Sequence, residues 1–419
     1  MAAVDNTAAA AYLKQRFTRK RIQNLSFQGG PFYAMIPKDE SFGGENLKCP
    51  VSYADLKGTS ATFSVAQANK AGSDTLAFLL TTVEDYALFS IKGKTIKQSR
   101  GDLNAWLPAL EKEAESAVRA LGRRASSGIY RSKNGAVSRV NETTGTTATL
   151  YSASGVTARG DVANFEKGMR ICFGTLASTT YGTATLRDGG KALTVSAIDR
   201  DGGALTTSAA LSTISGITTL DYIFPEGDAN MRLTGMEDWV PTTAAAAAST
   251  LFNVDRTSDT TRLGGIRYDA SGQNIVEALL GASTRSGEEG GTPDHVFCPF
   301  DKWKELGNYL GSQKQYVQGN AHTPEGGPKA DIAFSGYRVY GPTGGIDVYP
   351  DRHCQTNLIW MVQMDTLCLY STGPVPQLLD EDGQSILREV TDDAYEGRWG
   401  AYYQVGCNAP GYNVRITNV

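Results

Sequence analysis

The segment from residue 51 to residue 98 limits most strongly what this chain can fold into. It is typical of two alternating β-arms around a polar tip at residues 69–74, and it carries few apolar side chains of its own. Two strands with so little to bury are not stable alone in water. We therefore predict an extended hairpin that lies on another surface and contacts it through the apolar residues that alternate along its arms: Phe63, Val65, Leu76, Phe78 and Leu80.

Residues 1–50 are predicted to form an extended arm after a short Ala-rich helical start, because Gly and Pro recur from residue 29 to residue 50. Every charge between Asp5 and Asp39 is positive. A solvated basic face is the ordinary interpretation of such a run, and contact with nucleic acid or an acidic neighbour is the other. Apart from Lys38, these charges are clustered in the first part of the arm, at Lys14, Arg16, Arg19, Lys20 and Arg21, and these five are the candidates for such a contact.

The clearest helix of the chain is predicted within residues 99–144. Its apolar residues recur every three or four positions, as on one face of an amphipathic helix: Leu103, Leu107, Leu110, Ala114, Ala117, Leu121 and Ala125. Four arginines crowd its C-terminal half, where cations suit the helix dipole: Arg119, Arg123, Arg124 and Arg131. A helix of this length is expected to form a structural spine.

The remainder of the chain divides by composition. Residues 145–230 are rich in Thr, Gly, Ser and Ala, with short alternating runs between Gly-containing turns, which indicates a small β-barrel or sandwich. Residues 231–390 return to mixed α/β character, with helices predicted at 274–282 and 300–310 and strands at 337–340, 345–349, 358–364 and 367–370. Residues 391–419 end the chain with β-rich segments on both sides of Pro410. The predicted fold class is α+β.

Charge and hydropathy narrow the possible partners. The chain has 419 residues and a net charge of −4, so its surface as a whole does not favour nucleic acid and any such contact must be local. The sequence shows no apolar run with a cleavage site and no stretch near the ~18 apolar residues of a membrane helix, so we expect a cytoplasmic product without a membrane partner. The six cysteines are widely spaced in mostly apolar surroundings and are predicted to be buried free thiols.

No pattern of catalytic residues emerges from the sequence. Gly93, Lys94 and Thr95 resemble the end of a phosphate-binding loop, but the first glycine that such a loop requires is Leu88 here. His295, Cys298, His353 and Cys354 could supply zinc ligands, but adjacent residues on a strand point to opposite faces. Solvated turns explain the acidic runs at 380–382 and 391–393. The sequence therefore predicts no enzyme, no cofactor and no metal.

The order of these segments resembles the Hong Kong 97-like fold of tailed-bacteriophage major capsid proteins. Beyond the order, several stretches resemble one branch of that family, which carries an inserted β-domain. They are FEKGMRI (165–171), AIDRDGGALT (197–206), DYIFPEGD (221–228), LTGMEDWVP (233–241), LFNVDRTSDTTRLGG (251–265), TPDHVFCPFDKWKEL (292–306) and DDAYEGRWGAYYQVGCNAP (392–410). The resemblance covers the chain from about residue 60 onwards.

The resemblance implies a role for each segment. Residues 1–50 would be the N-terminal arm, 51–98 the extended loop called the E-loop, 99–144 the spine helix with part of the P-domain, and 145–230 the inserted β-domain. Residues 231–390 would be the A-domain together with strands of the P-domain, and 391–419 the return to the P-domain. Hexamers and pentamers would build an icosahedral shell around double-stranded DNA, with the basic arm inside and the hairpin between copies.

Further partners follow from the same resemblance: a portal, with separate scaffolding and decoration proteins as options. The virion would be the final location, after assembly in the cytoplasm of the bacterial host. Two alternatives remain open. One keeps the fold in a protein nanocompartment that encloses an enzyme. The other is a β-rich surface or tail protein that binds glycans through residues 145–230, which would require aromatic residues grouped on one face.

Overall fold

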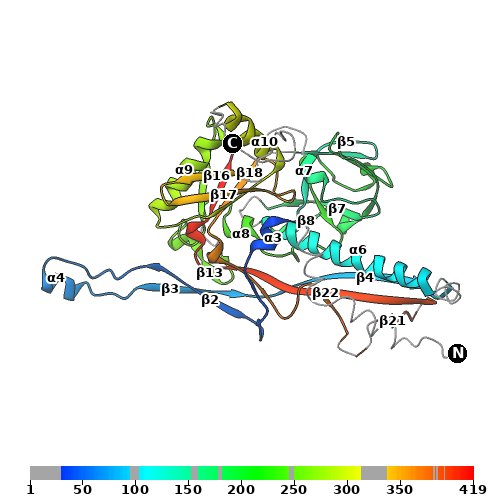
Figure 1. Cartoon of the computed structure of the whole chain (residues 1–419), viewed down its shortest axis with the longest axis horizontal. Coiled ribbons are helices and arrows are strands. Elements are labelled where there is room, and N and C mark those ends of the chain that lie inside the picture. Colours follow the sequence, from blue (N-terminus) through cyan, green and yellow to red (C-terminus); the bar gives the residue numbers. More distant parts are fainter. Residues whose placement is uncertain are drawn as a thin grey trace, which may run out of the picture.

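The structure is a computed structural model with mixed α and β elements arranged along a long β-ribbon (Figure 1). A projecting hairpin extends the ribbon at one end, and two compact units lie on the opposite side of the spine helix from the ribbon. The described residues are 30–94, 103–151, 159–177, 182–244, 250–312, 337–380, 383, 386–390 and 392–419.

The ribbon consists of two long strands that the sequence separates by more than three hundred positions. β4 (Val83–Lys92) pairs antiparallel with β22 (Ala394–Cys407) over its whole length. Four short strands complete this six-stranded sheet: β1 (Lys38–Asp39), β19 (Leu367–Ser371), β20 (Gln377–Leu378) and β21 (Leu387–Arg388).

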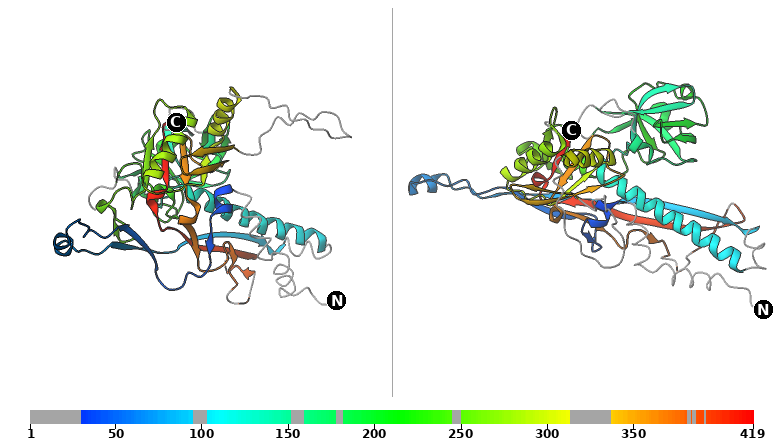
Figure 2. Two further views of the ribbon diagram at one scale, coloured as in Figure 1. Left: turned by 60° about the vertical axis from the view of Figure 1, so that its left-hand side comes forward. Right: turned by 45° about the horizontal axis from the view of Figure 1, so that its top comes forward.

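The spine helix α6 (Leu103–Tyr130) lies along the ribbon, as Figures 1 and 2 show. Three residues of the predicted apolar stripe, Ala114, Ala117 and Leu121, are buried together with Val118 and pack against Trp399 of β22. The predicted amphipathic helix is confirmed, because the spacing of its small apolar residues matches a flat sheet surface.

The extended hairpin is present, but its boundaries differ from the prediction. Its strands are β2 (Leu47–Ala54) and β3 (Asp74–Leu80), which pair from Leu47↔Leu80 to Ala54↔Asp74. Residues 62–65 were predicted to lie in a strand because they alternate. This prediction is wrong, since Phe63–Ala68 form the short helix α4 at the tip. Among the described residues no strand pairs with this segment, so its local Ala and Gln content favours helix.

The second arm predicted for this hairpin also divides. β3 pairs with β2, whereas β4 leaves the hairpin after Thr81 and Thr82 and enters the ribbon. A single alternating stretch in the sequence therefore serves two different sheets, because period-two alternation reports a half-buried strand and not its partner.

A second sheet lies beyond the spine helix and contains both neighbouring and distant segments. Its order is β14 (Ile266–Asp269), β23 (Val414–Thr417), β18 (Leu358–Val362), β15 (His295–Cys298), β17 (Gly344–Pro350) and β16 (Tyr337–Gly341). The predicted helices are α9 (Ile275–Glu288) and α10 (Phe300–Ser312), which pack with this sheet. The helices and strands predicted between 274 and 370 are thus confirmed.

The C-terminal segment 391–419, by contrast, contributes to two sheets. β22 joins the ribbon, and β23 joins the second sheet.

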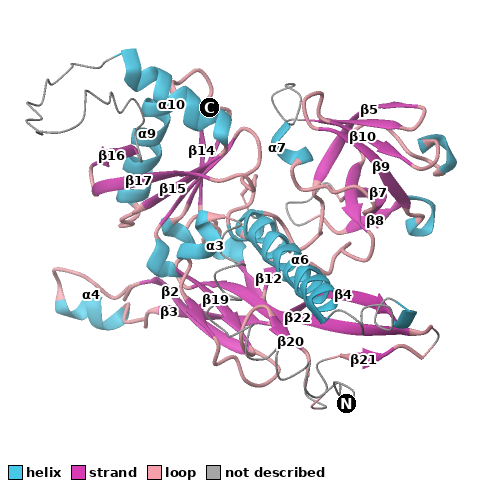
Figure 3. Ribbon diagram, turned by 45° about the vertical axis from the view of Figure 1, so that its right-hand side comes forward, coloured by secondary structure: helices cyan, strands magenta, loops and turns pink. Residues whose placement is uncertain are grey.

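The β-rich unit is a closed barrel with a core of its own (Figure 3). Its strand order is β11 (Tyr222–Pro225), β5 (Ser138–Thr144), β6 (Thr147–Tyr151), β10 (Ala204–Thr207), β9 (Leu193–Asp199), β7 (Arg170–Leu176) and β8 (Ala184–Leu186), and a pairing of β11 with β7 closes it. The barrel begins at Ser138, earlier than the predicted 145. The Gly-containing turn at Gly145 (φ 58°) joins two of its strands and is not a boundary.

The largest core cluster joins the hairpin root, the ribbon and the second sheet. It includes Phe78 of β3, Tyr403 of β22, Phe297 of β15 and Trp239 of the short helix α8 (Met236–Trp239). The first described helix, α3 (Pro31–Met35), adds Phe32, whose ring stacks on Phe297 with centroids 4.5 Å apart. Of the helices in the described ranges, none combines the length and apolar character that a membrane crossing needs.

The barrel should be separable from the rest of the chain, since its entry and exit are adjacent: the Val137 amide donates to the Ile223 carbonyl. Replacing residues 138–225 by a short Gly/Ser linker should leave a protein that retains the helical circular-dichroism signal of α6 and unfolds cooperatively on heating. Loss of all cooperative unfolding would mean that the remaining core depends on the barrel.

Candidate interaction surfaces

The five hairpin residues predicted to contact another surface have different environments. Phe63 and Val65, on α4, are 80% and 46% exposed, whereas Phe78 and Leu80, on β3, are fully buried. Leu76 is half-buried against the same core as Phe78 and Leu80. The side chains of Phe78 and Leu80 therefore fill the chain's own core, and this part of the prediction is corrected: the surface available to a partner is the tip.

The tip of the hairpin, residues 55–73, is held in shape by its own contacts. Lys57 forms an ion pair with Asp74 across the point where the two strands separate. A Cβ atom at Gly58 would lie 2.8 Å from the Cα of Lys70, so only glycine permits this close approach. Leu56, which is 61% exposed, adds a third apolar side chain to those of Phe63 and Val65. The tip is thus a shaped apolar surface that the described part of the chain leaves uncovered.

The five basic arm residues lie outside the described residues: Lys14, Arg16, Arg19, Lys20 and Arg21. Their placement inside a shell, and any contact with nucleic acid, stay predictions.

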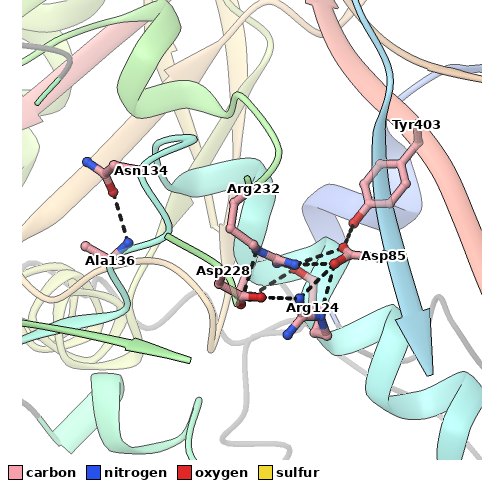
Figure 4. Close-up of polar contacts among 8 residues, drawn as sticks. Asp85, Arg124, Asn134, Ala136, Asp228, Arg232 and Tyr403 are labelled. Carbon is pink, nitrogen blue, oxygen red and sulfur yellow. Dashed lines mark hydrogen bonds and ion pairs between the residues drawn. The ribbon is translucent and has the colours of Figure 1, made fainter. Parts of the chain in front are cut away.

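A buried network of ion pairs fixes the root from which the hairpin projects (Figure 4). Asp85 of β4 accepts hydrogen bonds from Arg124 of α6 at 2.8 Å, from Arg232 at 2.6 Å and from the Tyr403 hydroxyl of β22 at 2.6 Å. Asp228 accepts from the same Arg124 at 2.8 Å. Two carboxylates and two guanidinium groups thus join the ribbon, the spine helix and the segment that leaves the barrel.

The network contains two carboxylates and two guanidinium groups, so each buried charge has a partner of opposite sign. Such pairing offsets the cost of removing charges from water. Burial acts to raise the pKa of Asp85, but Arg232 and Arg124 outweigh it and the pKa lies below its ordinary value. Burial likewise acts to lower the pKa of Arg124, and Asp85 with Asp228 outweigh it. Asp85 and Arg124 are therefore held in their charged forms, and the hydrogen bonds among the four side chains fix their relative geometry.

Sequence reasoning did not find this network. The arginines of the spine helix were attributed to the helix dipole, yet three of them make specific pairs with other elements: Arg123 with Glu166, Arg124 with Asp85 and Asp228, and Arg131 with Asp161. The available signal was Asp85 itself, an acidic residue at an inward position of an alternating strand, because such a charge requires a buried partner.

Removing one member of the network should be far more damaging than removing a surface pair. We expect Asp85→Asn to lower the free energy of unfolding by about 3–5 kcal/mol, since it leaves two buried guanidinium groups with one carboxylate. Chemical denaturation followed by fluorescence measures this value.

The matched control for that variant is Glu115→Gln on the exposed face of α6, where Glu115 pairs with Arg119 at 3.2 Å. Its effect should stay below about 1 kcal/mol. Equal effects of the two variants would contradict the account of the network.

Asp238 of α8 is a second buried carboxyl group, and no salt bridge to it is found among the described residues. Its two oxygens accept from the Ser132 hydroxyl at 2.6 Å and from the Lys133 amide at 2.7 Å, which connects α8 to the end of the spine helix. Burial raises the pKa of Asp238 from 3.8 to about 7.

This raised pKa makes the junction sensitive to pH. The folded protein binds a proton at Asp238 more tightly than the unfolded chain does, so the stabilising contribution is complete below about pH 4 and is lost as the pH rises through about 7. Asp238→Asn removes this titration; its amide oxygen can accept from the Lys133 amide, and its amide nitrogen can donate to the Ser132 hydroxyl oxygen, which reverses the direction of that hydrogen bond. Relative to the natural protein, the variant should become progressively more stable between about pH 4 and pH 8 in thermal unfolding experiments. A difference that does not change with pH would contradict the assignment.

The sulfur groups considered as metal ligands are free thiols. All six cysteines are free thiols, five of them buried and Cys368 half-buried, which confirms the predicted free thiols. Within the described ranges, no three His, Cys, Asp or Glu side chains come together as metal ligands.

Comparisons with known proteins give a likeness in fold and none in sequence. No family model matches the chain, and no curated protein is similar to it. Among solved structures, the capsid asymmetric unit of cyanophage A-1(L) has a TM-score of 0.53 with this chain at 11% identity, and the alignment covers 92% of this chain and 90% of that one.

Two further solved structures have lower TM-scores. A Mycobacterium phage Bobi structure has a TM-score of 0.41 at 10% identity over 93% of this chain and 90% of that chain. The capsid of a native GTA particle has a TM-score of 0.43 at 8% identity over 94% and 89%. The argument for the fold comes from the cyanophage capsid, whose alignment covers 92% of this chain. The resemblance read from the sequence is thus confirmed at the level of the fold, and this chain has the fold of a phage capsid protein.

Proposed function

We propose that this chain is a major capsid protein, a structural protein without catalytic activity. Hexamers and pentamers of it would form an icosahedral shell around double-stranded DNA. The observation that carries the proposal is the uncovered tip of the projecting hairpin on a chain with a capsid fold. The tip places Leu56, Phe63 and Val65 in solvent, far from the protein's own core.

Exposure of three large apolar side chains at one tip favours a partner surface. Fully burying such a side chain stabilises by roughly 1.5–3 kcal/mol, so the tip offers several kcal/mol to a contact before the costs of association. A contact between a tip and a different part of a second copy is heterologous, and such contacts close into rings when the rotation between copies allows it.

The chain also has a surface that can receive the tip. An open groove of about 750 Å³ lies at the hairpin root, with Leu79, Tyr86, Met231 and Phe252 among its lining residues. Met231 is 70% exposed there. We propose that the tip of one copy contacts this region of the next copy.

The remaining partners follow from the proposed role. The basic arm, with Lys14, Arg16, Arg19, Lys20 and Arg21, would face the interior and neutralise DNA phosphates without sequence preference. A portal, and separate scaffolding and decoration proteins where they are used, would complete a virion assembled in the cytoplasm of the bacterial host. The barrel would be the domain inserted into the capsid fold, placed on the outside of the shell.

The tip can be tested by removing its apolar character while keeping its length. The triple variant Leu56→Ser, Phe63→Ser, Val65→Ser should fold as the natural chain does, because these residues are exposed, and should assemble at least tenfold less well at equal concentration. Light scattering measures the loss of large particles, and circular dichroism measures the fold.

A matched control removes an equally exposed aromatic residue elsewhere. Tyr340, on β16 of the second sheet, is 74% exposed, and Tyr340→Ser should impair assembly less than the triple variant does. Normal shells from the triple variant would contradict the proposal that the tip contacts a neighbouring copy. If shells of the natural protein enclose an enzyme and hold no DNA that is protected from nuclease, the nanocompartment is favoured instead.

A further inference from the structure

A row of three side chains on the outer face of the barrel forms an unusual recognition surface. Arg139 of β5 lies directly opposite Tyr151 of β6 and directly opposite Tyr222 of β11. Paired residues on neighbouring strands point to the same face of a sheet. Their chain neighbours Val140, Leu150 and Ile223 belong to the barrel core, so the row points away from it.

The guanidinium group of Arg139 is held between the two rings. Its Cζ lies 5.2 Å from the ring centroid of Tyr222 and 5.5 Å from that of Tyr151, within the range of cation–π attraction. Its Nε donates to the Leu220 carbonyl at 2.8 Å. These contacts fix the plane of the guanidinium group, and no described residue is found to accept from its two terminal nitrogens.

Both rings are half-buried, and the described residues place no side chain directly opposite them on their outer flanks. On the far side of Tyr222 the paired residue is Gly174, which has no side chain. On the far side of Tyr151, β10 begins only at Ala204, which pairs with Thr149, so the strand does not extend opposite the ring. Leu220 adds an apolar side chain, 45% exposed, on a backbone with φ 76°, a conformation that disfavours leucine. Strained residues of this kind are often found at binding sites.

We propose that the row of Tyr222, Arg139 and Tyr151 binds an acidic carbohydrate. A pre-oriented guanidinium group with free terminal donors suits a carboxylate, which it can bind through two parallel hydrogen bonds. Half-buried aromatic rings at the surface suit the C–H-rich face of a pyranose, and the tyrosine hydroxyl groups can form hydrogen bonds with the hydroxyl groups of the sugar. A sugar acid combines the two features in one ring. The proposal does not depend on whether the chain forms shells.

Sequence analysis could not detect this row. The aromatic residues of the barrel are dispersed along the chain, and Tyr151 and Tyr222 are 71 positions apart. They come together because β5 lies between β6 and β11 in the closed barrel.

The test compares an oligogalacturonate with its neutral methyl ester, using calorimetry on the full-length protein. The two probes share their rings and differ in charge, so the acid should bind at least about tenfold more tightly than the ester. Arg139→Lys keeps the charge but loses the planar pair of donors, and it should weaken binding of the acid by about tenfold. Tyr222→Leu should weaken binding of both probes.

The matched control is Arg170→Lys, on β7 of the same barrel, where Arg170 is exposed and pairs with Glu226 at 2.8 Å. It should leave binding unchanged. Circular dichroism of each variant separates loss of the site from loss of the barrel. Binding of the acid that Arg139→Lys does not affect, or no binding at millimolar concentration, would overturn the proposal. Tighter binding of an Asp-rich peptide than of the acid, lost in the same variants, would replace the carbohydrate by an acidic protein partner.

Discussion

The ion pairs around Asp85 are the constraint on which the rest of the structure depends. Asp85 is 5% exposed, and it contacts Arg124 of the spine helix, Arg232 after the barrel and Tyr403 of the ribbon. Charged groups this deeply buried tolerate little displacement, because each lost contact leaves another charge without its partner. The helix, the ribbon and the barrel exit are therefore fixed relative to one another at the point where the hairpin begins.

The rigid root gives the projecting hairpin a defined direction. Two strands that leave a protein without a cover of their own would point in no defined direction. Here β3 is anchored by Phe78 and Leu80 in the main core, and β4 continues directly into the ribbon that holds Asp85. The anchored base delivers Phe63 and Val65 to a defined place, as repeated contacts in a shell require. The titration of Asp238 at the end of the spine helix adds a dependence on pH to the same junction.

Local patterns in the sequence predicted most of the elements and few of their partners. The apolar spacing from Ala114 to Ala125 gave the spine helix, and the alternation after residue 337 gave the strands of the second sheet. Alternation alone could not separate β3 from β4, nor assign β22 and β23 to different sheets, because pairing is decided by residues far away in the chain. Residues 62–65 were predicted to lie in a strand before the polar tip, yet Phe63–Ala68 form the helix α4, since a segment without a strand partner among the described residues follows its local preference. The buried ion network and the row around Arg139 were missed for a related reason: each joins residues from three or more separate segments.

The most direct test of the central claim is an experimental map of the purified protein by electron cryo-microscopy. The account predicts closed shells in which α4 of every copy lies on a neighbouring copy, with Phe63 covered and the hairpin root held by Asp85 as in the isolated chain. A monodisperse monomer, or shells in which α4 extends into solvent without a neighbour, would contradict it.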